Sequence, residues 1–438
     1  MDADVEGAGG AEACDVLVIG GGPGGATAAA LLAERGRDVV VLERETHPRF
    51  HIGESLLPLN TALFDRLGVR DAVAAIGEFK PGAEFVADAT GQRVHFAFSE
   101  GLNPSYTNSW QVPRATFDKL LFDAARARGA RAFEQTRVTA MEPAATPGAR
   151  ARVEAVGPGG ARRVFAPRFV LDASGRDAFL AGRLGTKVAN KRNNTAAVFG
   201  HFRGAQRREG ERAGYISVHL AEDGWFWMIP LPDEVMSVGF VGNPSVFRER
   251  SGTPRDLLLQ RIAASPTVRA RMTQATLIDE VVATGNYSYR STRCWGEGYA
   301  LIGDAFGFLD PVFSSGVLLA MTGGERGAEV ADAWLDDPAR GRVLAARMQR
   351  DMTHAMDRIA WLIYRINTPA LRTLFMAPRN TLRMRDGLVS LLAGNLRGTW
   401  RSVVPVLAFK SVYYVVAGLM RVGIHPPIAP SPRAFAAE

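Results

Sequence analysis

Cysteine is scarce in this sequence, and no apolar run is long enough to predict a membrane span. Only Cys14 and Cys294 occur among 438 residues, and two such distant thiols build neither a disulfide framework nor a cysteine-rich zinc site. Residues 1–13 are small and acidic rather than apolar, so no secretory signal is expected and a cytoplasmic location is predicted. The apolar segment Ser411–Met420 is short and bounded by basic residues, so we expect no transmembrane segment.

Charge of one sign is not concentrated anywhere along the chain. Lys and Arg outnumber Asp and Glu by 52 to 45, which gives a net charge of +7, but the basic residues are dispersed. This dispersion argues against nucleic-acid binding, whereas the positive balance suits an anionic cofactor or an acidic partner protein. With 47% hydrophobic and 22% charged residues, the chain can bury a large core, which excludes a disordered protein.

The first clear pattern is a strand, a glycine-rich turn, a helix and a second strand. Apolar runs at Asp15–Ile19 and Asp38–Leu42 flank the glycine cluster Gly20–Gly25 and the Ala- and Leu-rich stretch Ala26–Arg35. This order predicts a βαβ unit, in which a right-handed crossover helix joins two parallel strands.

The rest of the chain changes character twice. Short β-like runs over Phe79–Trp110 and an alternating, aromatic-rich stretch over Val198–Val241 predict a second, antiparallel sheet. Tyr299–Gly303 is one more buried strand, and the chain is helical after Gly316. We therefore predict an α/β fold: a Rossmann-like nucleotide-binding domain interleaved with an antiparallel-sheet substrate domain, then a C-terminal helical region. The predicted segments are a disordered leader (1–13), nucleotide-binding segments (14–75, 111–185 and 291–335), substrate-domain segments (76–110 and 186–290) and the helical region (336–438).

The glycine cluster fits the GxGxxG fingerprint of a dinucleotide site. Gly20 allows a tight turn, Gly22 lets backbone N–H groups approach a pyrophosphate, and Gly25 permits close packing of helix on strand. The helix is expected to begin near Gly24, directly after Pro23, with its positive end toward the phosphates. Glu43 ends the second strand, where a carboxylate can accept hydrogen bonds from a ribose. These residues predict a dinucleotide site and leave FAD and NAD both open.

A second set of motifs resembles the FAD-dependent aromatic hydroxylase superfamily. Gly303 and Asp304 end a buried strand, as in the second FAD fingerprint of that superfamily, whose Asp binds the ribityl chain. Asp172, in Leu-Asp-Ala-Ser-Gly, is similar to the middle motif, and Arg114 matches an Arg near the flavin. The resemblance implies that FAD is the cofactor and that these residues, Arg44 and the glycine fingerprint bind it.

Two further segments resemble those of the FADH2-dependent halogenases within this superfamily. Gly224–Pro230 matches their WxWxIP motif, which in the family lines the region between flavin and substrate and ends in Pro230. Trp225 and Trp227 are two apart and would face one side of a strand, a spacing that an aromatic core pair shares. Lys80, followed by Pro-Gly, resembles the active-site lysine that holds hypohalous acid in the family. A solvated surface lysine is the alternative interpretation of Lys80.

A third segment, Asp310–Val317, matches the DPxFSSG sequence of phenol and pyrrole halogenases. The resemblance implies that Pro311 and Gly316 border the flavin and that the backbone N–H groups of Ser315 and Gly316 bind the halide. An ordinary helix cap has the same residues. Phe313 stands where the tryptophan halogenases carry an acid, which disfavours free tryptophan as the substrate.

Two smaller features complete the site expected from the sequence. Glu54 and Ser55 belong to a Gly-Glu-Ser segment that matches the halogenase family after the first βαβ unit. His47 and His51 have the spacing of helical metal ligands, but Pro48 lies between them in an expected loop, so no metal site is predicted.

Together the motifs resemble those of a flavin-dependent halogenase of secondary metabolism, such as antibiotic biosynthesis. The resemblance implies that a separate flavin reductase supplies FADH2, which is used with O2 and chloride or bromide to halogenate a phenol- or pyrrole-type ring. The aromatic substrate would be free or tethered to an acyl or peptidyl carrier protein. An FAD-dependent monooxygenase, oxidase or desaturase of the same fold is the first alternative. A membrane-associated module, suggested by the apolar segment Val403–Met420, is the second.

Overall fold

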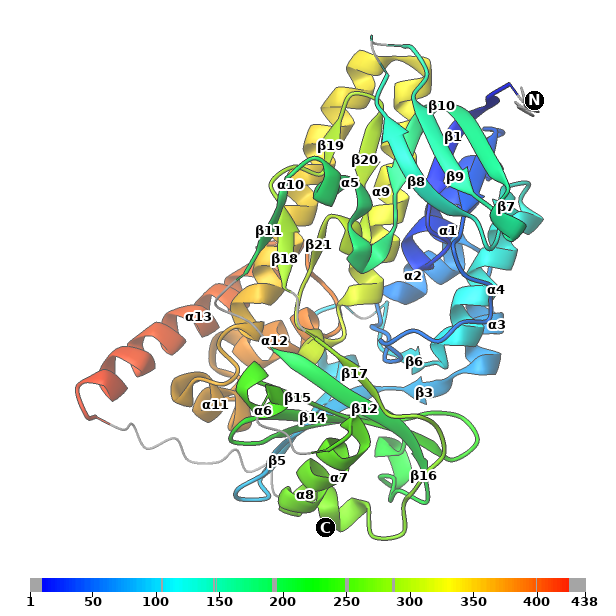
Figure 1. The fold of residues 1–438 in the computed structure, drawn as a ribbon. Helices are drawn as coiled ribbons and strands as arrows, with labels where there is room; N and C mark the ends of the chain where they lie inside the picture. Colours follow the sequence, from blue (N-terminus) through cyan, green and yellow to red (C-terminus); the bar gives the residue numbers. More distant parts are fainter. Residues whose placement is uncertain are drawn as a thin grey trace.

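The fold contains two main sheets and a group of C-terminal helices (Figure 1). The computed structural model describes residues 10–103, 105–144, 146, 148–190, 195–248, 252–285, 288–398 and 400–424. Of the leader expected over residues 1–13, residues 1–9 lie outside this description. The first strand already begins at Glu12, so the ordered chain starts earlier than the sequence suggested.

The first sheet combines strands from distant parts of the sequence. Its strands are β1 (Glu12–Ile19), β2 (Val39–Leu42), β7 (Arg131–Phe133), β8 (Arg137–Glu142), β9 (Arg152–Val156), β10 (Arg162–Asp172), β19 (Trp295–Gly296) and β20 (Tyr299–Leu301). The order β20-β10-β1-β2-β7 is parallel throughout, and β19 and the β8–β9 hairpin are antiparallel additions. β2 and the second half of β1, residues 16–19, are buried runs of Val, Leu and Ile, as expected for parallel strands covered on both faces.

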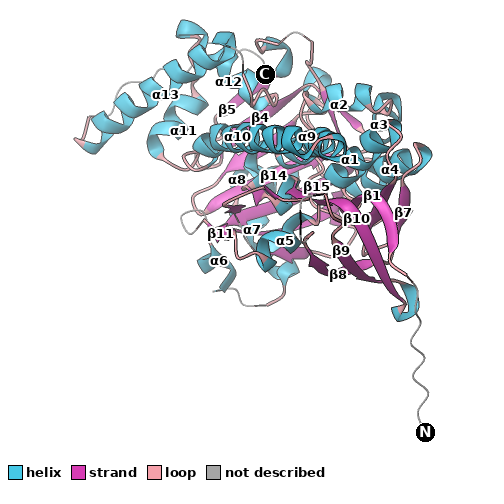
Figure 2. Ribbon diagram, turned by 90° about the horizontal axis from the view of Figure 1, so that it is seen from above, coloured by secondary structure: helices cyan, strands magenta, loops and turns pink. Residues whose placement is uncertain are grey.

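Glycines set how closely the helices of this domain approach one another. The helices α1 (Pro23–Glu34), α4 (Arg114–Ala127) and α9 (Gly316–Asp336) belong to this domain, and Figure 2 shows α1 and α9 next to each other. A Cβ atom at Gly324 would lie 2.3 Å from the carbonyl oxygen of Gly24, and one at Gly24 would lie 2.9 Å from that of Ala320. Only glycine therefore permits this contact between α1 and α9. The expected βαβ unit, β1-α1-β2, is confirmed.

The second sheet carries the aromatic-rich segments. Its strands are β4 (Gly82–Ala87), β5 (Arg93–Ala97), β12 (Ala196–Arg203), β13 (Ile216–Leu220), β14 (Gly224–Pro230), β15 (Val235–Gly242), β16 (Thr276–Leu277) and β17 (Val282–Thr284). Their order is β16-β12-β15-β14-β13-β4-β5, with β17 beside β12. The sheet was expected to be antiparallel, but β4 and β13 pair in parallel, because β4 comes from an earlier segment and is not joined to β13 by a hairpin.

One face of the second sheet packs on two helices and the other faces the main core. α7 (Pro254–Ala264) and α8 (Pro266–Arg271) bury Leu258 and Val268 against Phe226 and Met228 of β14. Short strand pairs join the two sheets at their margins. These are β3 (Glu78–Lys80) with β6 (Ser109–Gln111), and β18 (Tyr289–Ser291) with β11 (Lys187–Ala189) and β21 (Gly307–Phe308).

The C-terminal part is helical, as predicted. Its helices after α9 are α10 (Pro338–Ile363), α11 (Pro369–Met376), α12 (Met384–Leu392) and α13 (Trp400–Arg421). Shorter helices earlier in the chain are α2 (Asn60–Arg66), α3 (Arg70–Ile76), α5 (Phe179–Arg183) and α6 (Pro244–Arg248). Turns of 3-10 helix occur at Phe98–Glu100, Pro158–Gly160, Gly175–Asp177, Gly210–Arg212, Gly303–Ala305, Pro311–Phe313 and Thr381–Arg383. By length and composition alone, α13 is long and apolar enough to cross a membrane. The sequence interpretation ended the apolar segment at Lys410, but the helix continues through it, and the Lys410 ammonium lies 4.9 Å from the centre of the Trp361 ring.

Candidate active site

The carboxyl ends of three parallel strands meet at one edge of the first sheet. Asp172 at the end of β10 pairs with Ile19 at the end of β1 on one side and with Leu301 at the end of β20 on the other. The segments that follow these residues therefore lie close together, which is the usual place for a ligand in a parallel sheet. The structure thus brings together the glycine turn, the Asp172 segment and the Gly303–Asp304 turn.

The glycine turn leaves the start of α1 open. Gly20 has a φ of +101°, and a Cβ atom at Gly25 would lie 2.0 Å from the carbonyl oxygen of Gly20. Gly22 is the N-cap of α1, Pro23 follows it, and no side chain caps the helix. The first N–H groups of α1 are thus available to an anion such as a pyrophosphate.

Glu43 holds the glycine turn in place. Its buried carboxylate accepts hydrogen bonds from Gly21 N at 2.8 Å and Glu45 N at 3.0 Å, and it lies 3.4 Å from the Arg49 guanidinium. A carboxylate has further acceptor positions, so contact with a ribose is compatible with this tether. Arg44 is directed elsewhere and forms an ion pair with Asp177.

The two predicted aspartates have different surroundings. Asp172 accepts hydrogen bonds from Ser174 N at 2.9 Å and Leu180 N at 2.7 Å, so it organises the turn after β10. Among the described residues, no donor reaches the Asp304 carboxylate, and burial raises its pKa to about 6. An open helix N-terminus and a carboxylate with free acceptor positions fit the pyrophosphate and the hydroxyl-bearing ribityl chain of FAD.

Arg114 anchors the loop that leads to Glu54. Its guanidinium donates to both carboxylate oxygens of Asp118 at 2.8 and 3.1 Å, and to the carbonyl oxygens of Ile52 at 2.6 Å and Gly53 at 3.2 Å. Asp118 was not singled out in the sequence. Its i,i+4 spacing from Arg114 on a predicted helix was the available signal.

Glu54 connects the loop to the second sheet through a histidine that sequence reasoning missed. The His201 Nε2 atom lies 2.7 Å from Glu54 Oε1, and Nδ1 pairs with Asp279. Burial alone would lower the pKa of His201, but the bonds and charges of Glu54 and Asp279 outweigh it and raise the pKa to about 9. His201 is therefore an imidazolium between two carboxylates at neutral pH. The partners are 147 and 78 residues away, and no local pattern marks such a pairing.

We expect His201→Gln to destabilise the protein most at low pH, by up to about 3 kcal/mol. Because the pKa of His201 is raised in the folded protein, its imidazolium stabilises the fold fully below pH 6.5, the usual pKa of histidine. This stabilisation is lost as the pH rises through about 9. Denaturant unfolding across this range measures the difference between variant and wild type. If the loss of unfolding free energy caused by His201→Gln does not change with pH, His201 does not have a raised pKa. When the same substitution is made in a Glu54→Gln protein, the loss should depend less on pH.

Lys80 is a buried side chain, not a surface lysine. It is 1% exposed, and Nζ donates a 2.7 Å hydrogen bond to the carbonyl oxygen of Leu56. Burial lowers its pKa to about 7, because no carboxylate among the described residues pairs with it. Near pH 7 a large fraction of the amine is therefore neutral. Beside it lies a mainly apolar cavity of about 20 Å³, lined by Leu57, Lys80, Ala83, Phe85, Phe98, Ile216, Val218, Val312, Phe313, Ser314 and Leu392.

A row of buried polar groups shares one face with Lys80. Ser109 lies directly across from Lys80 in the β3–β6 pair, and Gln111, two residues on, is bridged to Ser55, so all four side chains point the same way. Ser55 Oγ, Ser109 Oγ and Gln111 Oε1 have no hydrogen-bond partner within the described chain. Buried polar atoms of this kind usually bind ordered water or a ligand.

The segment before α9 forms another wall of the same cavity. The Phe313 ring lies 6.0 Å from Phe85 and 6.1 Å from Phe375, centre to centre. After the Pro311–Phe313 turn, Ser314 adopts a φ of +56°, a strained conformation that is common at functional sites. Ser315 occupies the N-cap position of α9 without a side-chain capping hydrogen bond, and no described group accepts a hydrogen bond from the backbone N–H of Ser315 or Gly316.

Both tryptophans of β14 face the main core. Trp225 and Trp227 are buried with rings 5.8 Å apart, and Trp227 Nε1 donates to Ser237 Oγ at 3.1 Å. A Cβ atom at Gly239, across from Trp227, would lie 2.2 Å from the indole. Pro230 ends this strand and is buried. The pair is thus a tightly packed part of the core on the side of the nucleotide-binding domain.

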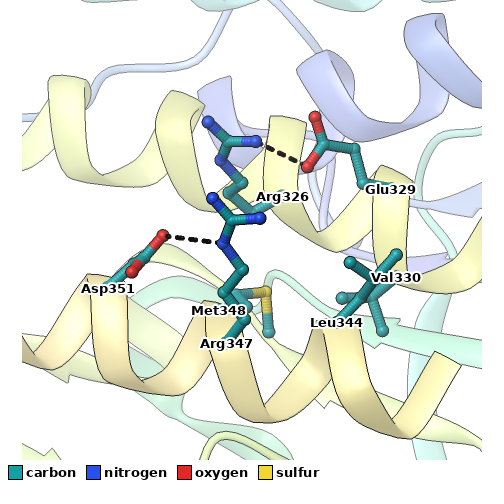
Figure 3. Close-up of a pocket in the computed structure, with 7 residues that line it drawn as sticks. All are labelled: Arg326, Glu329, Val330, Leu344, Arg347, Met348 and Asp351. Carbon is teal, nitrogen blue, oxygen red and sulfur yellow. Dashed lines mark hydrogen bonds and ion pairs between the residues drawn. The ribbon is translucent and has the colours of Figure 1, made fainter. Parts of the chain in front are cut away.

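A separate hollow between α9 and α10 has a different character (Figure 3). It shares no lining residue with the cavity around Lys80. Its two arginines face its two carboxylates, with Arg326 2.6 Å from Glu329 and Arg347 3.9 Å from Asp351. This mutual neutralisation leaves little net charge to select a ligand.

The family comparison agrees with the geometry of the glycine turn and Asp304. Residues 13–322 match the family described as the FAD binding domain. A tryptophan 2-halogenase of Chondromyces crocatus is 36% identical over 70% of this chain and 58% of its own length. The flavin-dependent halogenase rdc2 of Metacordyceps chlamydosporia is 32% identical over 71% of this chain and 63% of its own length. The chain thus spans about six tenths of these relatives.

Solved structures extend the similarity over nearly the whole chain. A flavoprotein/dehydrogenase of Cytophaga hutchinsonii has a TM-score of 0.84 and 29% identity, and covers 94% of this chain and 100% of its own. The myxobacterial chondrochloren halogenase CndH has a TM-score of 0.76 and 27% identity, and covers 92% of this chain and 96% of its own. The predicted fold class and the resemblance to FAD-dependent halogenases are confirmed.

Proposed function

This chain belongs to the FAD binding domain family, and from that premise we propose that it is a flavin-dependent halogenase of electron-rich aromatic rings. One observation carries the proposal: Lys80 and the Phe313–Ser314 segment before α9 line the same cavity. A buried amine without a carboxylate partner beside an aromatic-walled space suits delivery of an electrophilic halogen to a ring. We infer small phenol- or pyrrole-type substrates of secondary metabolism.

The residues proposed to hold FAD surround the carboxyl edge of the first sheet. The open first turn of α1, reached through Gly20, Gly22 and Gly25, would bind the pyrophosphate, with Glu43 toward the ribose. Asp304 would accept hydrogen bonds from the ribityl chain. When bound, FADH2 would supply two electrons and two protons, and would be left as FAD, in a reaction that converts Ar–H, halide, one further proton and O2 into Ar–X and two water molecules.

We propose that Asp172, Gly303 and Arg114 act on the FAD site mainly by shaping it. Asp172 fixes the turn after β10, and Arg114 fixes the loop before Glu54. Pro311 and Gly316 would border the flavin at the start of α9. Arg44 would act on the FAD site indirectly, by holding the Gly175–Asp177 turn through its ion pair with Asp177.

Halide and oxidised halogen would be held by different groups. The free N–H groups of Ser315 and Gly316 at the start of α9 would bind chloride or bromide. Lys80 would hold the hypohalous acid formed from it, by hydrogen bonding or as a haloamine formed by the neutral amine. The unpartnered oxygens of Ser55 and Ser109 would bind water beside Lys80. The closely packed Trp225 and Trp227 would exclude bulk water from this region.

We also propose a separate flavin reductase as the source of FADH2, and cytoplasmic action. An acyl or peptidyl carrier protein is a candidate carrier of the aromatic substrate, since the net charge of +7 suits an acidic partner.

A mass-spectrometric assay tests the function. The chain would be combined with a generic flavin reductase, NADH, FAD and a panel of phenols, free and carrier-linked pyrroles, and free tryptophan, with chloride, with bromide and without halide. The expected product gains one halogen and requires halide. A gain of one oxygen or a loss of two hydrogens, independent of halide, overturns the proposal in favour of a monooxygenase or desaturase.

A further inference from the structure

Helix α13 has two apolar faces, only one of which packs on the protein. It projects from the body in both views (Figures 1 and 2) and packs by one side on α11 and α12. At the margin of its other side, the Tyr414 hydroxyl accepts a 3.0 Å hydrogen bond from Trp361 Nε1 of α10. On its other side Trp400 is 74% exposed and Val415 is 62% exposed. Exposed apolar side chains that are contiguous usually mark an interaction surface.

The exposed side chains form one stripe along the whole helix. The exposed uncharged residues, here called the α13 stripe, are Trp400, Val404, Leu407, Ser411, Tyr414, Val415 and Gly418. At about 100° per residue they fall within a sector about 100° wide. The buried residues Ser402, Pro405, Val406, Phe409, Tyr413 and Val416 fall on the opposite side. The stripe is therefore a continuous apolar surface about 30 Å long.

Only positive charge borders the α13 stripe. Arg401 projects on one side of it and Arg421 on the other, by the same helical geometry. Half-buried Lys410 lies on the same side as Arg421, with its ammonium over the Trp361 ring. No Asp or Glu occurs between Asp386 and Glu438 in the sequence. An apolar stripe with a Trp and a Tyr between rows of basic side chains has the composition of a helix that lies in a lipid headgroup layer.

We propose that α13 binds the surface of a membrane that contains anionic lipids, with the α13 stripe buried at the boundary of headgroups and acyl chains. The helix would lie in the surface rather than cross it, because its other face is occupied by α11 and α12. A second copy of this chain fits less well. A two-fold contact along the stripe would bring the same basic residues together without an acid to pair them.

Vesicle co-sedimentation of the full chain tests this proposal. We expect wild type to pellet with vesicles of phosphatidylcholine and phosphatidylglycerol, less with phosphatidylcholine alone, and less in high salt. Val404→Glu and Val415→Glu should each weaken binding about tenfold or more, because each removes buried apolar area and adds repulsion from anionic lipid. Val343→Glu, at a 68% exposed position on α10, is the matched control and should bind as wild type.

Circular dichroism and FAD binding establish whether the variants are folded. In a folded variant, loss of sedimentation with vesicles is then due to the change in the α13 stripe. Absence of wild-type binding to anionic vesicles overturns the proposal, as does equal binding by the Val404 and Val415 variants. A dimer in lipid-free solution that the same substitutions dissociate assigns the stripe to a second copy instead. Binding of an acidic carrier protein through the stripe, without binding to vesicles, also overturns the lipid assignment.

Discussion

Lys80→Met should lower the rate of halogenated product formation by about 10²- to 10⁴-fold, the usual range for removal of a positioned catalytic group. Methionine retains a long apolar side chain, so the cavity beside β3 stays filled. The variant removes the Nζ atom, which in wild type donates to the Leu56 carbonyl oxygen. No amine then remains in the cavity to hold the hypohalous acid.

The measurement is halogenated product by mass spectrometry, alongside the rate of FADH2 oxidation. The oxidation rate should change little, because Lys80 is assigned to the cavity and not to the flavin site. Lys119→Met is the matched control: Lys119 lies on α4, is half-exposed and pairs with Asp123, and its loss should leave product formation unchanged. Product formation by Lys80→Met at the wild-type rate contradicts the lysine role and leaves FAD binding untouched.

Gly25→Ala should abolish tight FAD binding, with the Kd rising about 100-fold or more, which corresponds to about 2.7 kcal/mol. The added Cβ would lie 2.0 Å from the Gly20 carbonyl oxygen and 3.1 Å from the Ala173 Cβ. Gly20 directly follows β1 and Ala173 directly follows β10, so the added Cβ forces the glycine turn itself to move. The first N–H groups of α1 would then no longer point toward the proposed pyrophosphate position. Fluorescence titration with FAD measures the effect.

Two further glycine variants separate cofactor binding from folding. At Gly22 a Cβ atom would meet only the Arg49 side chain, at 3.5 Å, so Gly22→Ala should fold normally and still bind FAD more weakly by occupying the phosphate approach. Gly182→Ala on α5 meets nothing within 4 Å and should bind FAD as wild type does. Wild-type affinity in both Gly25→Ala and Gly22→Ala would contradict the placement of the pyrophosphate.

Local sequence patterns predicted the elements that depend on local interactions. The apolar strands, the glycine turn and the helix of the βαβ unit are encoded within residues 14–42, and the structure contains them as β1, α1 and β2. The long helices after Gly316 were predicted for the same reason. The parallel β4–β13 pair was not predicted, because the paired residues, such as Ala83 and Ile216, are 133 positions apart. Strands so far apart in sequence carry no local signal for their relative direction.

In the candidate site, too, the sequence identified residues, but their surroundings depend on tertiary packing. The resemblance to halogenases identified Lys80 and the segment before α9, but a lysine followed by Pro-Gly is normally exposed. Its burial, its hydrogen bond to Leu56 and its lowered pKa arise only when β3 packs beneath the second sheet. No local pattern in the sequence indicates His201, which lies between Glu54 and Asp279.

The amino-acid sequence by itself determined the dinucleotide-binding glycine turn, the order of the motifs and the helical C-terminal region, because each depends on short-range periodicity or on motif residues. Tertiary structure alone decided that Asp304 keeps a free carboxylate, that Lys80 is desolvated beside Phe313, and that one apolar face of α13 is left uncovered. The physical reason is that pKa values, cavities and exposed faces depend on which distant surfaces exclude water from a group. That exclusion exists only once the two sheets and the C-terminal helices have packed together.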